Sequence, residues 1–225
     1  MPVTPSPPAR PAPVAPRLVP SPAHAQPTSL TPRDEWDQVR VVRSDLSGCV
    51  ADQVEIAACE LRGVLFTGSE LERLRLVDVV ATDCEFSGTI THQASMVRVE
   101  FRNCRMSGLV ASDSRLSSVQ FIDCKLDDAN FRFATGDQIV FDRCSLAGAD
   151  FYEATLTASA FDSCDLTRAQ FSKATVRGVR LAGSRLEGLR GAIAMSGVVL
   201  GSDQVLPMAL SVFSDLGIVI EHEDR

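Results

Sequence analysis

Residues 144–173 read CSLAG ADFYE ATLTA SAFDS CDLTR AQFSK, and the six groups share one pattern. The first residue of each group is small, the third is Leu or Phe, and polar side chains concentrate at the other three positions. A five-residue period with two apolar positions fits neither an α-helix of period 3.6 nor a strand of period 2. The chain must therefore turn at regular intervals, with two side chains of each group directed inward and three outward.

The same register extends from Ser44 to Ile193 without an insertion or deletion. Of these 30 groups, 24 have Leu, Phe, Ile, Met or Val at the third position, and 26 have Ala, Cys, Ser, Thr or Val at the first. A 20-residue period is superimposed on the five-residue one, because cysteine and phenylalanine recur once every four groups. The recurring residues are Cys84, Cys104, Cys124, Cys144 and Cys164, and Phe101, Phe121, Phe141 and Phe161. Four groups per turn predict a four-sided coil whose identical residues stack as core ladders.

This pattern resembles that of the pentapeptide-repeat family, whose idealised unit is Ala-(Asp/Asn)-Leu-X-X. The resemblance implies a right-handed quadrilateral β-helix. We therefore expect an all-β solenoid of about 7.5 coils with a C-terminal capping helix, roughly 36 Å long at ~4.8 Å per coil. Asp or Asn is sparse at the second position, and Val39 and Val41 fit one further group before Ser44.

Two departures from the ideal repeat predict local features. Glycine ends several groups of one column, for example Gly48, Gly68 and Gly88, so that corner is expected to need a positive φ. The usual bulky third residue is missing at a few positions, where we expect the core to thin or bend. These positions are Ala51, Ala81, Thr91, Ala111 and Gly136.

Residues 1–30 hold ten prolines among Ala, Ser and Val, a composition that predicts a disordered, polyproline-like tail. Residues 31–43 are expected to cap the solenoid, with a helix that starts at Thr31-Pro32-Arg33-Asp34 and Trp36 over the first coil. The Ala-, Pro- and Arg-rich tail resembles actinobacterial sequences in composition.

Residues 194–225 are expected to form a terminal helix and a short extended tail. Ser202 is placed at the N-cap of a helix that runs to Leu216 and stops at Gly217. The family resemblance implies that such an element can pair two copies, and the helix can equally cover only its own barrel. The residues predicted to form the dimer interface or the cap are Val205, Met208, Leu210 and Phe213.

Nothing in the sequence predicts catalysis. The cysteines of the ladder are 20 residues apart and not in close pairs, so we expect buried, reduced thiols in the core, with no metal and no cofactor, in a reducing cytoplasm. The three histidines lack an evident catalytic partner, and neither a Walker nor a dinucleotide-binding glycine motif is present. The chain is expected not to be an enzyme.

The outward faces are therefore the candidate functional surface. A net charge of −7 argues against direct binding to nucleic acid, and no segment predicts a membrane span. The resemblance implies a protein partner, with DNA gyrase or topoisomerase as the specific candidate, since some members of the family mimic duplex DNA. The acidic residues predicted to face such a partner are Asp123, Asp142, Asp162 and Asp165. The alternative is a structural interaction scaffold with another partner.

Overall fold

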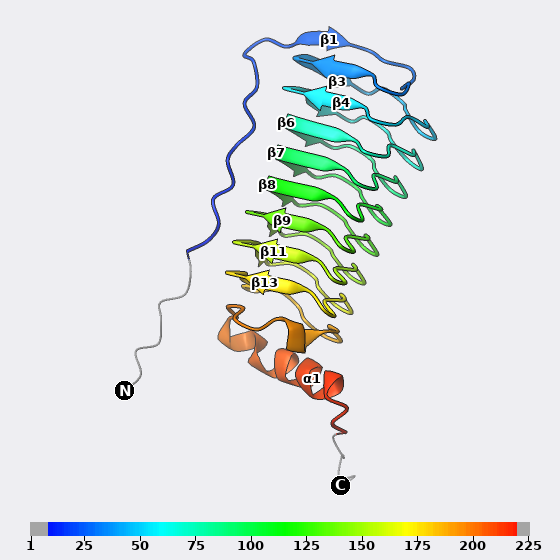
Figure 1. Ribbon diagram of the computed structural model, residues 1–225. Helices are drawn as coiled ribbons and strands as arrows, with labels where there is room; N and C mark the ends of the chain where they lie inside the picture. The colour runs from blue at the N-terminus through cyan, green and yellow to red at the C-terminus, as the bar shows by residue number, and fades with distance from the viewer. Residues whose placement is uncertain (1–8, 220–225) are drawn as a thin grey trace.

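The computed structural model describes residues 9–219 of the 225-residue chain. The described residues form a parallel β-solenoid closed by one helix at its C-terminal end (Figure 1). Within these described residues thirteen short strands make up the sheet, and their pairings are parallel. Their bounds are β1 Ala23–Ala25, β2 Glu35–Asp37, β3 Val39–Val42, β4 Glu55–Ala57, β5 Glu60–Arg62, β6 Arg75–Thr82, β7 Ser95–Arg102, β8 Arg115–Ile122, β9 Thr135–Asp137, β10 Val140–Asp142, β11 Thr155–Thr157, β12 Ala160–Asp162 and β13 Thr175–Arg177.

The coil has four faces, one for each pentad of a turn. Face 1 contains the pentad 44–48 and those that follow it every 20 residues, and faces 2, 3 and 4 start in the same way at 49–53, 54–58 and 59–63. Long strands such as β7 bend from face 3 into face 4, whereas faces 1 and 2 are joined by single bridges between coils. Except at the first rung (β1 with β3) and at the last (Arg180 with Val199), paired residues are 20 apart, as Phe101 and Phe121 are, so the predicted four-sided coil is confirmed.

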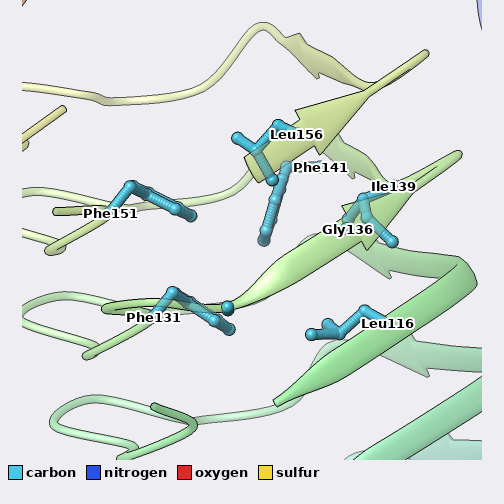
Figure 2. A pocket seen from close by; sticks show the side chains of 8 residues that line it. Leu116, Phe131, Gly136, Ile139, Phe141, Phe151 and Leu156 are labelled. Carbon is cyan, nitrogen blue, oxygen red and sulfur yellow. The ribbon is translucent and has the colours of Figure 1, made fainter. Parts of the chain in front are cut away.

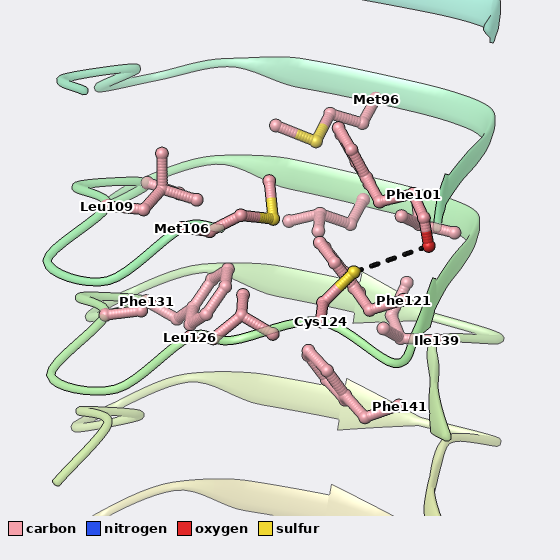
Figure 3. Packing of buried hydrophobic residues seen from close by; sticks show 14 of the residues in the cluster. Met96, Phe101, Met106, Leu109, Phe121, Cys124, Leu126, Phe131, Ile139 and Phe141 are labelled. Atoms are coloured by element: carbon pink, nitrogen blue, oxygen red, sulfur yellow. Dashed lines mark hydrogen bonds between the residues drawn. The ribbon is translucent and has the colours of Figure 1, made fainter. Parts of the chain in front are cut away.

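The interior consists of the first and third residues of the pentads. The side chains of the Phe101 column lie 4.8–5.0 Å from ring to ring and nearly parallel, and the neighbouring Phe131 column meets them edge to face. Figure 3 shows these rings together with Met96, Met106 and Cys124 between the coils. Stacking a flat ring on its copy one coil above satisfies the close packing that a protein interior requires.

Every fifth residue from Arg33 to Gly188 has a positive φ, so each corner of the coil uses a left-handed residue. The sequence prediction, which assigned this conformation to one glycine column, was too narrow. Many corners carry residues with a side chain, including Arg98, Ala158 and Phe133. The surrounding structure holds many of these residues in this strained conformation, because their N–H donates to a carbonyl one coil further on, as Asp123 N does to Asp142 O at 3.0 Å.

The core does not thin appreciably at Gly136. An added Cβ there would lie 2.9 Å from both Ile139 Cγ1 and Leu156 Cδ2, because these side chains lean into the space. The apolar cavity that remains has a volume of ≈ 10 Å³, about the minimum that one water molecule needs. Leu116 and Phe131 also line it (Figure 2). Neighbouring coils therefore fill the gap that the glycine leaves.

The N-terminal end differs from the prediction. No helix starts at Thr31; instead the Asp34 carboxylate accepts hydrogen bonds from the Thr31 N–H at 2.7 Å and its hydroxyl at 2.6 Å, which makes a tight turn. Trp36 lies in β2 and packs, half-buried, against the core. Residues 34–43 thus continue the repeat, which confirms the extra group at Val39 and Val41.

Residues 9–30 also differ from the prediction of disorder, while residues 1–8 lie outside the described part. Ala23–Ala25 forms β1 and pairs with β3, so it adds a rung to face 4. Leu30 is buried at the open end of the barrel. The segment before β1 runs back along the side of the solenoid, seen in blue in Figure 1. Long-range contacts, described below, keep this segment against the coils.

The C-terminal end is closed by a 3-10 turn, Ser202–Gln204, followed by α1, Val205–Asp215. Ser202 was predicted at the N-cap of this helix but lies within the 3-10 turn. Gln204 occupies the N-cap position of α1 instead. The buried Gln204 amide donates to the carbonyls of Leu181 and Ser184, and its oxygen accepts the Gly201 N–H at 2.8 Å. Pro207 falls in the first turn of α1, where its missing N–H is harmless.

The helix ends at Asp215 with Leu216 at its C-cap, one residue before the predicted end, and Gly217 follows with a φ of 70°, as predicted. Ile218 and Val219 are not part of a strand, and the remainder of that predicted extended piece, Ile220, lies outside the described residues. Within residues 9–219 no helix has both the length and the apolar character needed to cross a membrane.

Candidate partner-binding surfaces

The cysteine ladder lies inside the barrel. All seven cysteines are free thiols, and each of Cys84, Cys104, Cys124, Cys144 and Cys164 is at most 3% exposed. The thiols donate to backbone carbonyls of the preceding coil, as Cys124 Sγ does to Phe101 O at 3.5 Å (Figure 3). Contact with the thiols of Cys124 and Cys84, followed by burial, raises the pKa of Cys104. These thiols fill the interior, as the sequence predicted, and are shielded from solutes.

The described residues contain no group of three or more His, Cys, Asp or Glu side chains that could hold a metal ion. One histidine does lie near both a serine and an aspartate: His92 Nδ1 is 2.9 Å from Ser112 Oγ and 3.6 Å from an Asp113 oxygen. Both groups approach the same ring nitrogen, whereas a catalytic triad needs them on opposite nitrogens. This cluster therefore lacks the geometry of a Ser-His-Asp triad.

The four predicted acidic residues gather near the edge between faces 4 and 1. Asp142 and Asp162 are partners in adjacent strands β10 and β12, Asp123 directly follows β8, and Asp165 lies on face 1. Each is paired with an arginine. Arg143 binds Asp123 at 2.7 Å and Asp142 at 3.0 Å, and Arg185 binds Asp165. The structure brings the four carboxylates together but compensates their charge.

A further arginine reaches this edge from the N-terminal segment. Arg10 contacts Asp162 at 2.7 Å and Asp142 at 3.3 Å, with 53% of its own side chain exposed. The two carboxylates are only 15% and 21% exposed. Arg10 was not predicted as a site residue, because more than 130 positions separate it from its partners and no local pattern marks such a contact.

A second surface, which sequence reasoning missed, is an aromatic–cationic patch of Arg132, Phe133, Tyr152 and Lys173. The Arg132 guanidinium lies 4.4 Å from the Tyr152 ring centroid and 5.5 Å from that of Phe133. Lys173 lies 5.0 Å from the Tyr152 ring, and its amine donates to the Tyr152 hydroxyl at 2.5 Å and pairs with Glu153. Phe133 and Tyr152 meet edge to face at 5.9 Å. The available signal was that the only tyrosine and an extra phenylalanine occupy outward positions one coil apart.

The predicted interface residues on α1 point in two directions. Met208 is buried against the last coil, so it belongs to the cap. Val205, Leu210 and Phe213 are 60%, 45% and 40% exposed. They are part of an apolar surface that the sequence located only partly. This exposed α1 surface consists of Val205, Leu206, Leu210, Phe213, Leu216, Ile218 and Val219.

Comparison with known proteins places the repeat in a family. A family model described as "Pentapeptide repeat region" matches residues 94–157 and 114–190. No curated protein matches the sequence significantly.

Several solved structures are similar to the chain. They include trypsin-treated QnrB1, a plasmid-mediated fluoroquinolone resistance protein, at 21% identity and a TM-score of 0.46, over 88% of this chain and 99% of that one. HetL, a pentapeptide repeat protein involved in heterocyst differentiation regulation from the cyanobacterium Nostoc sp. strain PCC 7120, is 14% identical over 70% of this chain and 85% of its own, with a TM-score of 0.35. The matched region and the four-sided coil agree: residues 94–190 are a pentapeptide repeat region, and the same coil continues on both sides of it.

Proposed function

We propose that this protein is a non-catalytic, protein-binding solenoid whose partner docks on the aromatic–cationic patch. The observation that carries the proposal is Phe133, which is 44% exposed and has a φ of 60°. A bulky residue in the left-handed region costs about 1–2 kcal/mol, and an exposed ring recovers little of that by burial. A binding role would account for an aromatic residue at a corner where glycine or asparagine would be less strained.

The composition of the patch supports the same proposal. Tyrosine, phenylalanine and arginine are enriched in the central parts of protein interfaces, where a few residues supply most of the binding energy. Arg132 is held in place by Asp150 at 3.1 Å, and Lys173 by Glu153 at 3.2 Å, so less side-chain entropy would be lost on binding. The rigid coils keep these four side chains in register.

Crosslinked capture from a lysate of the source cell tests this proposal. Wild type, Phe133→Gly, Tyr152→Ala and the control Val50→Ala would be compared, since Val50 is also exposed and also lies on face 2, away from the patch. We expect at least one protein that wild type and the control retain and that both patch variants lose. Identical capture by all four proteins would contradict a docking role for the patch.

DNA gyrase is a second, more specific candidate partner, suggested by the family resemblance and by the position of Asp142 and Asp162 on adjacent rungs. Duplex DNA has one negative charge per ~1.7 Å, so a mimic needs an acidic face without compensation. The arginine contacts of these carboxylates limit the likeness, and Arg10 contributes two of them. Release of Arg10 would make the edge more acidic.

A supercoiling assay of purified gyrase, with and without a fluoroquinolone, tests this candidate. We expect inhibition or drug protection by the wild-type protein, a stronger effect of Arg10→Glu, and loss of the effect on Asp142→Lys/Asp162→Lys. If none of the three proteins affects gyrase or topoisomerase IV, gyrase is not the partner. The scaffold proposal would then rest on the aromatic–cationic patch alone.

We further propose a homodimer through the exposed α1 surface and a reducing, cytoplasmic setting. An apolar surface of seven neighbouring residues at the end of the rod is larger than scattered exposed side chains would give. The seven free thiols favour a reducing compartment.

A further inference from the structure

Two residues on the outside of face 4 are buried although they point away from the barrel. Val140 and Ala160 occupy the second position of their pentads, an outward position, and are 3% and 0% exposed. They are paired partners in β10 and β12, and neither belongs to the interior apolar cluster. Their burial means that other atoms cover them on the outside of the barrel wall.

Residues 9–22 make contacts to the same two strands. Arg10 binds Asp142 and Asp162, which lie two positions after Val140 and Ala160 in the same strands. Nearer the other end of the segment, the Arg17 N–H donates to Asp78 Oδ1 at 2.9 Å. We call Asp78, Val140, Asp142, Ala160 and Asp162 the tail-covered surface.

The segment crosses the coils in an extended form. Three coils separate the levels of Asp78 and Asp142, or about 14 Å at ~4.8 Å per coil. The seven residue steps from Arg10 to Arg17 span about 22 Å as polyproline II, which is enough for this path. Figure 1 shows the segment alongside the stacked strands and not within the sheet.

The chemistry of the contact is that of polyproline recognition. Pro11, Pro13 and Pro16 are half-buried, whereas Ala12 and Val14 between them are exposed. Prolines have no N–H to satisfy and lose little entropy when an extended segment binds, so shallow surfaces can hold them. A cation bridging two carboxylates adds the specific polar contact.

The attachment is exchangeable. Between Ala9 and Pro22, the Arg10 side chain and the Arg17 N–H make the polar contacts to the coils. Half of the Arg10 side chain is exposed, and ion pairs in such positions contribute only about 0–1 kcal/mol. A segment of the same chemistry can therefore compete with the tail.

We propose that the tail-covered surface is a binding site for an extended, proline-rich, arginine-bearing segment of a partner protein, and that residues 9–22 occupy it as an internal competitor. The site lies on face 4 and at its corner with face 3, away from the aromatic–cationic patch of face 2, and does not depend on the function proposed there. It defines the class of ligand: a cationic polypeptide without regular secondary structure.

Fluorescence anisotropy tests the proposal with a fluorescein-labelled peptide of residues 9–22 as the probe. Full-length wild type, Arg10→Glu and the control Arg33→Glu are titrated with it. The linked tail competes at a high effective concentration, so we expect Arg10→Glu to bind the probe roughly tenfold more tightly than wild type or the control. Adding Asp142→Asn and Asp162→Asn to Arg10→Glu should remove this gain, as should Glu in place of the probe's own Arg10.

Amide hydrogen exchange of the Arg17 N–H tests whether residues 9–22 occupy the tail-covered surface. We expect protection in wild type and its loss in Arg10→Glu, with unchanged thermal unfolding. Equal exchange of this amide in the two proteins would show that Arg10 does not hold the tail. Release of the tail without any gain in probe binding would show that the surface takes no peptide. A concentration-dependent dimer that Arg10→Glu dissolves would assign the site to the tail of a second copy. Each of these three results overturns the proposal.

Discussion

At a corner of this coil, the left-handed backbone conformation costs free energy for a residue with a side chain, whether or not that side chain contacts other atoms. At Gly88, with a φ of 63°, an added Cβ would meet no atom within 4 Å, so space does not restrict the position. At Gly191, with a φ of 78°, the same atom would lie 2.1 Å from Ser172 N. The two glycines therefore separate conformational strain from steric overlap, since the left-handed region alone costs a residue with a side chain about 1–2 kcal/mol.

Gly88→Ala is expected to lower the free energy of unfolding by about 1 kcal/mol, and Gly191→Ala by clearly more, because the backbone of the adjacent coil must move. Urea unfolding followed by circular dichroism measures both. Ser87→Ala, at the preceding exterior position, is the control. If Gly88→Ala were as stable as wild type, the corner would tolerate a side chain freely, and the strain argument for Phe133 would fail with it.

The thiols offer a second test at the same scale. Burial raises the pKa of the Cys59 thiol, and the ladder cysteines are almost inaccessible, whereas Cys49 is half-buried. A polar reagent that reacts with thiolates should therefore label Cys49 first in the native protein and the other six only on unfolding. Mass spectrometry of the labelled peptides assigns the sites. Rapid native labelling of Cys124 would contradict the packed interior.

At the scale of elements, the repeat and the terminal helix were predictable, whereas the contacts that close the two ends were not. The alternation of small and large residues is local, so Cys124 and Leu126 already specify an inward pair wherever the coil places them. By contrast, the role of Gln204 depends on the three-dimensional structure. Its amide donates to the carbonyls of Leu181 and Ser184 in the last coils, and only the structure shows that these carbonyls need donors. The same holds for residues 9–22. Their proline content predicts disorder, and only the structure shows that Arg10 contacts the coils.

The candidate site was predictable only in part for the same reason. The sequence located the four aspartates near one corner of the coil but not how arginines pair with them, because this pairing depends on rotamers across coils. The aromatic–cationic patch needed the coil geometry, since Phe133 and Tyr152 are 19 positions apart and only the 20-residue turn makes them neighbours.

The terminal helix carries the next prediction. Leu206→Glu/Leu210→Glu places two charges on the exposed α1 surface without touching the buried Met208. A dimer held by this surface should dissociate at least about tenfold more readily, while the monomer unfolds at an unchanged temperature. Light scattering coupled to size-exclusion chromatography measures the mass. Monomeric wild-type protein at all accessible concentrations would rule the interface out, and α1 would then serve only as a lid.

At the scale of the whole molecule, several acidic side chains are paired with a basic side chain one coil away. Pairs 20 residues apart connect successive coils, as Arg40 does with Glu60 and Arg98 with Asp78. Such pairs reinforce the parallel register, because like charges stacked at ~4.8 Å would repel. A net charge of −7 is thus spread over the rod as small local imbalances.

These pairs predict how stability depends on pH. The guanidinium of Arg98, followed in smaller measure by the Arg17 N–H, holds the pKa of Asp78 below its ordinary value, and Arg40 and Arg143 do the same for the pKa values of Glu60 and Asp123. A carboxyl whose folded pKa is depressed releases its proton more easily in the folded state than in the unfolded one. Its stabilisation is complete above the unfolded pKa of about 4 and is lost as the pH falls through the lower folded pKa.

Stability should therefore be nearly constant above about pH 5 and fall steeply below about pH 4. Asp78→Asn should reduce this acid slope and leave the protein less stable at pH 7, whereas Asp203→Asn, in the exposed 3-10 turn, should leave the profile unchanged. Urea unfolding at intervals from pH 2.5 to 7 measures the profile. Because Asp78 also accepts the Arg17 N–H, the amide of Arg17 should lose its exchange protection over the same pH interval. An acid slope that Asp78→Asn leaves unaltered would mean that the ion pairs between coils contribute nothing measurable, and that the apolar ladders alone hold the rod together.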